Sequence, residues 1–252
     1  MKYAIIADIH ANLEALQAVL RDAAEQGCTH HVFLGDFVGY CADPKACLDI
    51  VRGMNAPCVK GNCDEYCATD FALDDFNPKA AKMVEWTRQQ LTENDRRWLH
   101  ALEYVRTVED FTIVHATLEA PEKWEYVFDK FTAASSLSRQ ATQVCFFGHT
   151  HVPVAFIHDP SELGQVTFRT PIRVDVNASS APSHVRGGTY SKFKIETGKK
   201  YFVNVGSVGQ PRDNNPKSAY VVYDMEKGTI ELRRCAYDIA ETQRKIREAG
   251  IR

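Results

Sequence analysis

The sequence lacks a long apolar run, an excess of basic residues and a CxxC pair, and each absence excludes a class of protein or site. Nothing in the chain approaches the roughly 20 apolar residues of a membrane span. The apolar run before Asp8 in MKYAIIADIH is also too brief for the core of a signal peptide. We therefore expect a cytoplasmic protein without a membrane partner.

Charges of both signs are interleaved along the chain, with 30 Lys and Arg against 33 Asp and Glu for a net charge of −3. A protein that binds a long nucleic acid needs a basic stripe to neutralise many phosphates. Because no such stripe is present, we expect no large nucleic-acid surface. The hydrophobic and charged fractions, 44% and 25%, are those of an ordinary folded protein, and the oligomeric state is left open.

The chain has eight cysteines but no CxxC pair, which argues against a structural zinc knuckle. Most are expected to be reduced thiols. Cys28, Cys58, Cys145 and Cys235 stand beside apolar residues, where a free cysteine behaves as a small buried hydrophobe. Cys63 is the exception, because it lies between Asn62 and Asp64 in the segment GNCDEY.

Apolar, often β-branched segments that end on glycine or a polar residue recur along the chain and predict buried strands. They are YAIIAD, HVFLGD, CVKGN, TIVHA, VCFFGHTH and YFVNVG. Between the first two, Leu13, Leu16 and Leu20 have helical spacing, with Asn12 as the predicted N-cap and Gly27 as the stop. This opening predicts a β-α-β unit.

Further helices are expected over DPKACLDIVRGM, NPKAAKMVEWTRQQL and TENDRRWLHAL, the last with Thr92 and Asp95 spaced as a capping box. Residues 65–110 are therefore predicted to be a mostly helical insertion. The second half has strand and turn patterns, including a hairpin around MEKG, before a final surface helix. We expect one domain over residues 1–252 of the α/β (α+β) class, with two packed sheets between helices and a mobile loop at about 177–188.

Potential metal ligands follow the predicted strands, at the edge where ligands gather in open α/β sheets. These residues are Asp8, His10, Asp36, Asn62, His115, His149 and His151. Alternate residues of a short extended segment point to the same side, so DxH and HxH are each expected to aim two donors at one pocket. Carboxylate, imidazole and amide donors suit first-row divalent metals such as Mn, Fe, Co, Ni or Zn.

Seven donors exceed what one tetrahedral ion binds, and they favour two ions about 3.5–4 Å apart, bridged by a carboxylate and a solvent oxygen. Asp36 is the expected bridge. Such a centre lowers the pKa of bound water and holds a phosphoryl group for in-line attack. We therefore predict two divalent ions as cofactors, with Mn favoured for activity, and a small phosphorylated substrate.

In chain order, DxH at 8–10, GD at 35–36, GN at 61–62, a lone histidine at 115 and GHTH at 148–151 resemble the motifs of the calcineurin-like metallophosphoesterase superfamily. The resemblance implies a four-layer fold, in which a double β-sandwich is flanked by helices. It also implies one ion held by Asp8, His10, Asp36 and His151, and a second held by Asp36, Asn62, His115 and His149.

The segments GNCD and NVGSVGQPRD are more similar to those of small bacterial and archaeal phosphodiesterases than to serine/threonine phosphatases, which would show GNHE and HGG. We therefore expect a hydrolase that cleaves phosphodiester or phosphoanhydride bonds through a metal-bridging hydroxide. The alternatives among enzymes are a dinucleoside polyphosphate hydrolase and a broad phosphomonoesterase or protein phosphatase. The alternative from another class is a non-catalytic interaction scaffold on the same fold.

Asn62, Cys63 and Asp64 are the predicted catalytic residues. The resemblance implies that a histidine in the place of Cys63 would protonate the leaving oxygen, oriented by the acidic residue that follows. A thiol has an ordinary pKa of about 8.5 and nearby metal charge favours its thiolate, so cysteine is a poor proton donor there. We expect a preference for leaving groups of low pKa; the alternative is that Cys63 only packs the loop while Asp64 or water handles the proton.

Asn12, Tyr40 and Arg212 are predicted to contact the substrate. The planar guanidinium of an arginine matches a pair of phosphate oxygens. His184 and Arg186, in the loop expected to be mobile, are weaker candidates for the same role.

Overall fold

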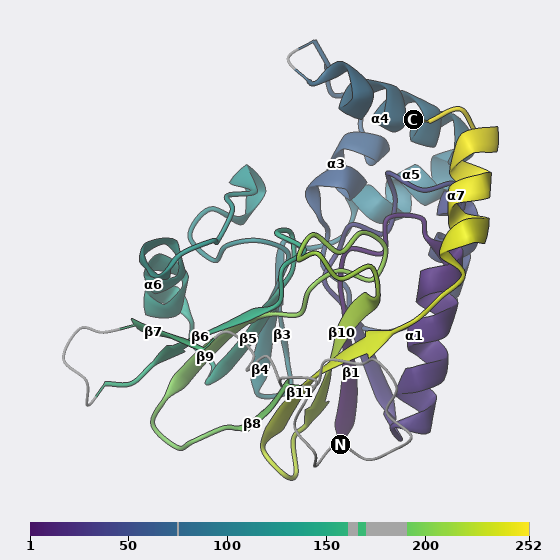
Figure 1. Ribbon diagram of the computed structural model, residues 1–252. Helices are drawn as coiled ribbons and strands as arrows, with labels where there is room; N and C mark the ends of the chain where they lie inside the picture. Colours follow the sequence, from purple (N-terminus) through teal and green to yellow (C-terminus); the bar gives the residue numbers. More distant parts are fainter. Residues whose placement is uncertain (75, 161–165, 170–190, 252) are drawn as a thin grey trace.

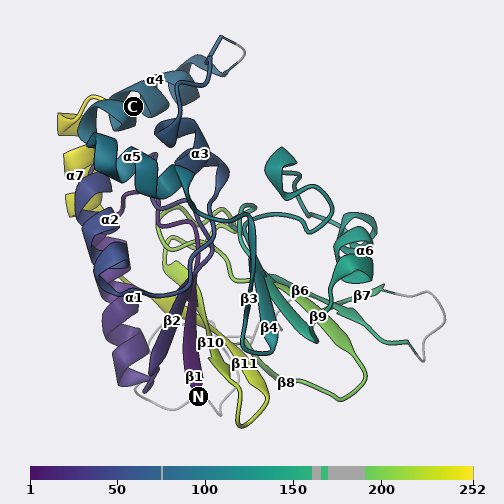
Figure 2. The same cartoon turned by 180° about the vertical axis from the view of Figure 1, so that it is seen from behind.

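Two β-sheets stack face to face, and helices cover the outer side of each (Figures 1 and 2). This computed structural model describes residues 1–74, 76–160, 166–169 and 191–251. The order of layers is helices, sheet, sheet, helix, which confirms the predicted α/β class and the four-layer sandwich. Within the described residues, no helix is both long and apolar enough to cross a membrane.

The first sheet has the strand order β2-β1-β10-β11-β8. Its strands are β1 (Lys2–Ile6), β2 (His30–Phe33), β8 (Ser191–Lys194), β10 (Ser218–Asp224) and β11 (Thr229–Cys235). β1 and β2 run parallel, whereas β10 lies antiparallel to both β1 and β11. The β10–β11 pair turns at residues 225–228, as the MEKG segment predicts.

The second sheet has the order β3-β4-β5-β9-β6-β7. Its strands are β3 (Val105–Val108), β4 (Phe111–Val114), β5 (Val144–Phe147), β6 (Val154–His158), β7 (Val166–Arg169) and β9 (Lys200–Asn204). β4, β5 and β9 are parallel and buried, which explains their continuous apolar sequences. Their carboxyl ends therefore lie along one edge of the sheet.

Three apolar cores separate the layers. One lies between the two sheets and includes Ile5, Val32, Phe146 and Val221. A second lies between the first sheet and the large helical layer, and a third between the second sheet and α6. The helices are α1 (Leu13–Glu25), α2 (Pro44–Gly53), α3 (Asn62–Ala68), α4 (Pro78–Gln90), α5 (Glu93–His100), α6 (Lys130–Arg139) and α7 (Ile239–Glu248), with a 3-10 turn η1 at Pro121–Lys123.

Local sequence signals fixed several helix starts. The Asn12 side chain accepts a hydrogen bond from the Ala15 amide and caps α1. The Thr92 and Asp95 side chains and amides form the predicted capping box at α5. Each cap satisfies amide groups that the first turn leaves without a helical partner.

Three elements differ from those expected. The CVKGN segment forms only one bridge, between Phe33 and Cys58, because the chain turns at Gly61 directly into α3. The helical insertion ends before residue 110, since β3 already pairs with β4 across a tight turn. Helix α6 was not expected at all, and the loop at 177–188 with its two candidate residues lies outside the described residues.

Candidate metal centre

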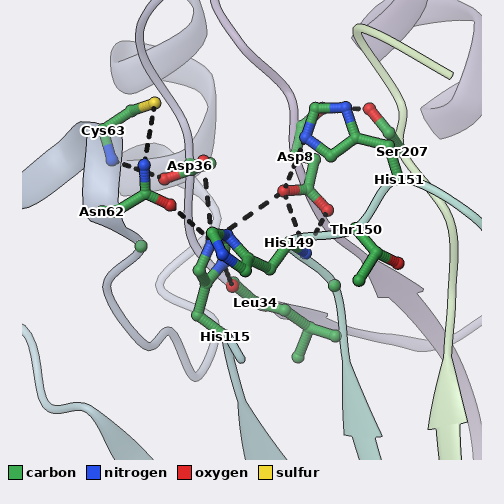
Figure 3. A network of polar contacts seen from close by, with 12 residues as sticks. Asp8, Leu34, Asp36, Asn62, Cys63, His115, His149, Thr150, His151 and Ser207 are labelled. Carbon is green, nitrogen blue, oxygen red and sulfur yellow. Dashed lines mark hydrogen bonds and ion pairs between the residues drawn. The ribbon is translucent and has the colours of Figure 1, made fainter. Parts of the chain in front are cut away.

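Polar residues that follow four strands meet at one edge of the sandwich. The first sheet contributes the residues after β1 and β2, and the second sheet contributes those after β4 and β5. The residues are Asp8, His10, Asp36, His115, His149 and His151, all of them buried. Asn62 joins them from the start of α3 rather than from a strand end. Figure 3 shows the labelled side chains converging from these separate segments.

The backbone of these segments is not extended. Asp8, His10, His149 and His151 all have positive φ, between 49° and 66°. The DxH and HxH segments are therefore tight turns. The two side chains of each segment do point toward one site, as expected, but they do so because of the turn and not because the backbone is extended. Such conformations cost a non-glycine residue about 1–3 kcal/mol and persist only where the surrounding structure imposes them.

Four of the donors surround one point. The ligand atoms of Asp8, His10, Asp36 and His151 all lie within 4.8 Å of one another. His10 Nε2 is 3.6 Å from Asp36 Oδ2, and His151 Nε2 is 3.4 Å from Asp8 Oδ1. These are the four residues that the resemblance implies for one ion, and their metal-binding role remains a prediction that this geometry supports.

The two imidazoles in this group face each other in a way that a cation explains. His10 Nδ1 lies 3.2 Å from the Val38 carbonyl oxygen, and His151 Nδ1 lies 2.6 Å from the Gln210 carbonyl oxygen. A carbonyl oxygen only accepts, so each Nδ1 carries a proton, and each ring in its neutral form presents a lone pair at Nε2. The two Nε2 atoms are 3.0 Å apart. A proton on one of the two nitrogens or a cation beside both would satisfy this contact, and with the carboxyl groups of Asp8 and Asp36 adjacent the donor set fits a metal ion.

A second, adjoining group contains Asn62, His115 and His149. His115 Nε2 is 3.3 Å from Asn62 Oδ1 and 3.5 Å from Asp36 Oδ2, while its Nδ1 bonds the Leu34 carbonyl at 2.7 Å. The His149 ring centroid is 5.0 Å from that of His115. His149 uses Nε2 to bond a backbone carbonyl, that of Trp124, at 2.8 Å, so Nδ1 is the nitrogen left for a ligand. The group thus resembles the second ion site, with His149 presenting the opposite ring nitrogen.

Burial and mutual interactions shift the pKa values of several side chains in the cluster. Burial opposes the charge of Asp8, but the facing imidazoles, above all His151, hold the pKa of its carboxyl below the usual range. Burial and the charge of Asp8 raise the pKa of Asp36 to about 7. Burial, followed by the neighbouring imidazole, lowers the pKa of both His10 and His149. The lowered pKa values of His10 and His149 favour the neutral imidazoles that bind a metal, whereas binding through Asp36 requires that its carboxyl group lose its proton.

Asp64 clamps two of the ligand-bearing loops together. Its carboxylate accepts hydrogen bonds from the amides of Asp36, Phe37 and Gly61 at 2.7, 2.9 and 3.0 Å. The side chain is completely buried. Its contacts are thus with the backbone that carries Asp36, which makes it a positioning residue instead of the partner expected for Cys63.

Cys63 is buried beside the bridging candidate. Its side chain is 2% exposed, and its amide donates to Asp36 Oδ1 at 2.8 Å. Burial, reinforced by the nearby carboxylates, raises the pKa of the Cys63 thiol. A thiol of raised pKa is a weak acid, and the poor proton donor expected at this position stays a prediction.

The three predicted substrate contacts separate into two groups. Asn12 is 1% exposed, and its side chain bonds Ala15, Gly209 and Thr242, so it acts as a structural cap and its substrate contact stays an untested prediction. Tyr40 packs its ring edge on the His10 imidazole at 4.7 Å, and the exposed Arg212 lies over Tyr40 at 5.8 Å. These two residues lie beside the first donor group, and their substrate contact stays a prediction.

The sequence did not reveal two kinds of residue that shape the site. They are glycines that let a ligand side chain approach the backbone closely, and residues that contribute only a backbone carbonyl group. A Cβ on Gly148 would lie 2.5 Å from Asp8 Oδ2, and one on Gly61 would overlap the Asp36 carboxylate. The carbonyls that orient the histidines carry no sequence signal, because every residue has one. Trp124 and Tyr126, which contact His115 and His149, could have been found from the alternating aromatics of WEYVF.

Comparisons with known proteins agree with this arrangement. Over 247 residues the chain is 32% identical to an uncharacterized protein of Methanocaldococcus jannaschii, covering 96% of this chain and 90% of that one. A metallophosphoesterase from Sphaerobacter thermophilus has 34% identity and a TM-score of 0.82, with 99% and 94% of the two chains covered. A hypothetical protein from Pyrococcus horikoshii shares the fold, with 16% identity, a TM-score of 0.75 and coverage of 100% and 94%.

The family assignment rests on most of the chain. Residues 1–228 match the calcineurin-like phosphoesterase superfamily domain. This range contains every residue of both donor groups and all strands except β11. The chain belongs to the calcineurin-like phosphoesterase superfamily.

Proposed function

We propose that this protein is a binuclear metal-dependent phosphohydrolase that cleaves phosphodiester or phosphoanhydride bonds. The observation that carries the proposal is the pair of imidazole nitrogens, His10 Nε2 and His151 Nε2, which face each other 3.0 Å apart beside two buried carboxyl groups. Buried polar groups need partners, and a cation would be a common partner for all four side chains of this group.

The residues fit two adjoining ions. Asp8, His10, Asp36 and His151 would hold one, and Asp36, Asn62, His115 and His149 the other. When bound, such a pair of divalent cations supplies a deprotonated water as nucleophile and offsets the charge that develops on the phosphoryl group. The imidazole and carboxylate donors suit manganese, iron, cobalt, nickel or zinc, and we favour manganese as the activating ion.

Asp36 is suited to join the two groups. Its Oδ1 is engaged by the Cys63 amide, which leaves Oδ2 toward the centre. That oxygen lies 3.6 Å from His10 Nε2 and 3.5 Å from His115 Nε2. One carboxylate oxygen therefore faces a histidine from each group, as a bridging ligand must.

The remaining chain groups would hold and orient the phosphate. Arg212 extends exposed over Tyr40, so its guanidinium is available to a phosphate at the rim. Asn62 is only partly buried, and its amide can offset charge on a phosphoryl oxygen. Burial keeps the Cys63 thiol weakly acidic, so it is a poor proton donor to the leaving group. Burial and the charge of Asp36 raise the pKa of Asp64 to about 7, but its carboxyl oxygens are engaged by the amides of Asp36, Phe37 and Gly61.

The test is a substrate panel on protein stripped with a chelator and reloaded with manganese. We expect hydrolysis of bis-p-nitrophenyl phosphate and of a dinucleoside polyphosphate, with slower turnover of serine phosphate. The Asp36→Asn variant should lose metal binding and turnover, whereas Asp49→Asn, which alters an exposed aspartate on α2, serves as the matched control. Absence of bound metal together with inactivity would favour the scaffold alternative, and fastest turnover of serine phosphate would favour a phosphomonoesterase.

Replacing the cysteine tests the leaving-group argument. Cys63→His would restore an imidazole at the loop and should raise turnover most for substrates with poor leaving groups, such as alkyl esters. Cys63→Ala, which removes the thiol without adding an acid, is the control. If both variants keep the wild-type ranking of substrates, the residue packs the loop and takes no part in proton transfer.

A further inference from the structure

An exposed aromatic surface adjoins the candidate metal centre. Among the described residues, the large hydrophobic side chains that are exposed are Met1, Phe71, Tyr126, Phe128 and Phe131. Tyr126 is 49% exposed and Phe128 is 65% exposed. Aromatic rings gathered at the surface are costly to leave in water and often mark a binding site.

Tyr126 is stacked directly on His149, a metal-ligand candidate, and Phe128 is stacked on Tyr126. The Tyr126 ring lies parallel to the His149 imidazole, with centroids 4.2 Å apart and an interplanar angle of 24°. Phe128 is nearly parallel to Tyr126, at 5.4 Å and 3°. The three rings therefore form one stack, with His149 in the second donor group, Tyr126 in the middle and Phe128 at the exposed end.

The segment that carries these rings is held to the centre at two further points. The Trp124 carbonyl accepts the hydrogen bond from His149 Nε2, and the Trp124 ring meets the His115 ring edge-on at 5.8 Å. Trp124 also has a φ of +55°, an unfavourable conformation that these contacts impose. The exposed rings thus have a defined position beside the donors.

A second group of aromatic rings lies on the α3 side. Asn62 and Tyr66 are one turn apart on the same face of α3. Tyr66 packs against Phe76 at 4.9 Å and against the exposed Phe71 at 5.5 Å. Both views show α3 and the segment before α6 rising on two sides of the strand ends (Figures 1 and 2).

The polar and aromatic ends of the centre are separate. Arg212 and Tyr40 lie by His10, in the first donor group, whereas Tyr126 lies on His149, in the second. A phosphate placed at the donors would have a cationic side chain at one end and flat apolar rings at the other. This polarity fits an organic phosphate that carries a flat aromatic group better than a sugar or amino acid phosphate.

We propose that Phe128, backed by Tyr126, forms a platform on which the base of a nucleotide substrate stacks while its phosphate lies at the metal centre. This inference rests on the proposed phosphohydrolase function and names its substrate class. Base–aromatic stacking contributes about 1–3 kcal/mol per base, which corresponds to roughly 5- to 150-fold in affinity. Stacking also tolerates any base, so the platform selects nucleotides without selecting one sequence.

The test compares two ligands that differ only in the base. AMP and ribose 5-phosphate are titrated into the manganese-loaded protein by calorimetry, and both are used as inhibitors of bis-p-nitrophenyl phosphate hydrolysis. We expect wild-type protein to bind AMP at least about fivefold more tightly. The Phe128→Ala and Tyr126→Ala variants should bring the ratio of the two affinities toward one, whereas Tyr126→Phe, which keeps the ring, should preserve it.

Phe131→Ala is the matched control, because it removes an exposed phenylalanine that is 76% exposed on α6 and stacks on neither ring. The affinity ratio cancels any general weakening of phosphate binding. Equal affinities in wild-type protein, or a ratio that survives both alanine variants, would overturn the platform. The platform would also be overturned if the wild-type protein were a dimer that dissociates in the Phe128→Ala variant while the AMP to ribose 5-phosphate affinity ratio is unchanged. The aromatic surface would then join two copies of the chain.

The two proposals fail in different ways. If no manganese-loaded sample hydrolyses any ester but calorimetry shows a base preference that Tyr126 and Phe128 carry, the platform is supported and the phosphohydrolase function is not. If hydrolysis proceeds with no preference for AMP over ribose 5-phosphate, the function is supported and the platform is overturned.

Discussion

The Asp64 clamp gives the sharpest prediction of stability. Asp64→Ala would leave three buried amides, those of Asp36, Phe37 and Gly61, without an acceptor. A buried unsatisfied donor costs about 1–3 kcal/mol, so the three together should lower the free energy of unfolding by at least about 3 kcal/mol. Asp64→Asn keeps one oxygen but turns an NH₂ group toward one of the donors, which should cost about 1–3 kcal/mol.

The measurement is urea unfolding of the chelator-treated proteins at neutral pH, followed by far-UV circular dichroism and compared at equal m-value. Asp70→Ala is the control, since it makes the same substitution at a carboxylate whose side chain is 91% exposed and bonds Arg96. An exposed pair of this kind contributes at most about 1 kcal/mol. Asp64→Ala and Asp70→Ala of equal stability would refute the clamp.

Two further changes test the packing around the centre and the pH dependence of stability. Gly61→Ala should weaken manganese binding in calorimetry, because the added Cβ would overlap the Asp36 carboxylate, whereas Gly53→Ala, which meets nothing within 4 Å, should bind as wild type does. Equal manganese affinities of Gly61→Ala and wild-type protein would show that the loop around Gly61 can shift to accommodate the added Cβ. Burial opposes the charge of Asp22, but hydrogen bonds from Arg233 lower the pKa of its carboxyl. A lowered folded-state pKa stabilises the protein above the unfolded value of about 4, and this contribution is lost as the pH falls through the folded-state value. Asp22→Asn should therefore make the unfolding free energy less dependent on pH between about 5 and 2, and an unchanged slope would contradict the role of this pair.

Strong local patterns made much of the fold predictable. The apolar runs of β1, β4, β5 and β9, the cap at Asn12 and the box at Thr92 and Asp95 each act within a few residues, so sequence alone reveals them. Helix α6 has a weaker signal, because its serines and threonine favour caps and turns as much as helix interior. The short α3 was concealed because its first residue, Asn62, was interpreted as the end of a strand.

The candidate site was predictable in composition and less so in geometry. The donors could be named because their residue types are rare together at successive strand ends. Their orientation depends on positive φ angles and on carbonyls such as those of Val38 and Gln210, which sequence does not distinguish. The role of Asp64 depends on which backbone amides the fold places beside its carboxyl group. The burial of Asn12 depends on Thr242, which is 230 residues away in the sequence.

The donors come from both sheets, and this has a consequence for folding. Asp8 and Asp36 follow strands of the first sheet, whereas His115 and His151 follow strands of the second. One bound ion would therefore connect the two sheets of the sandwich, as a covalent cross-link does. A ligand that binds only the native state shifts the folding equilibrium in proportion to its affinity. Metal supply would then govern how long the folded chain survives as well as how fast it turns over substrate.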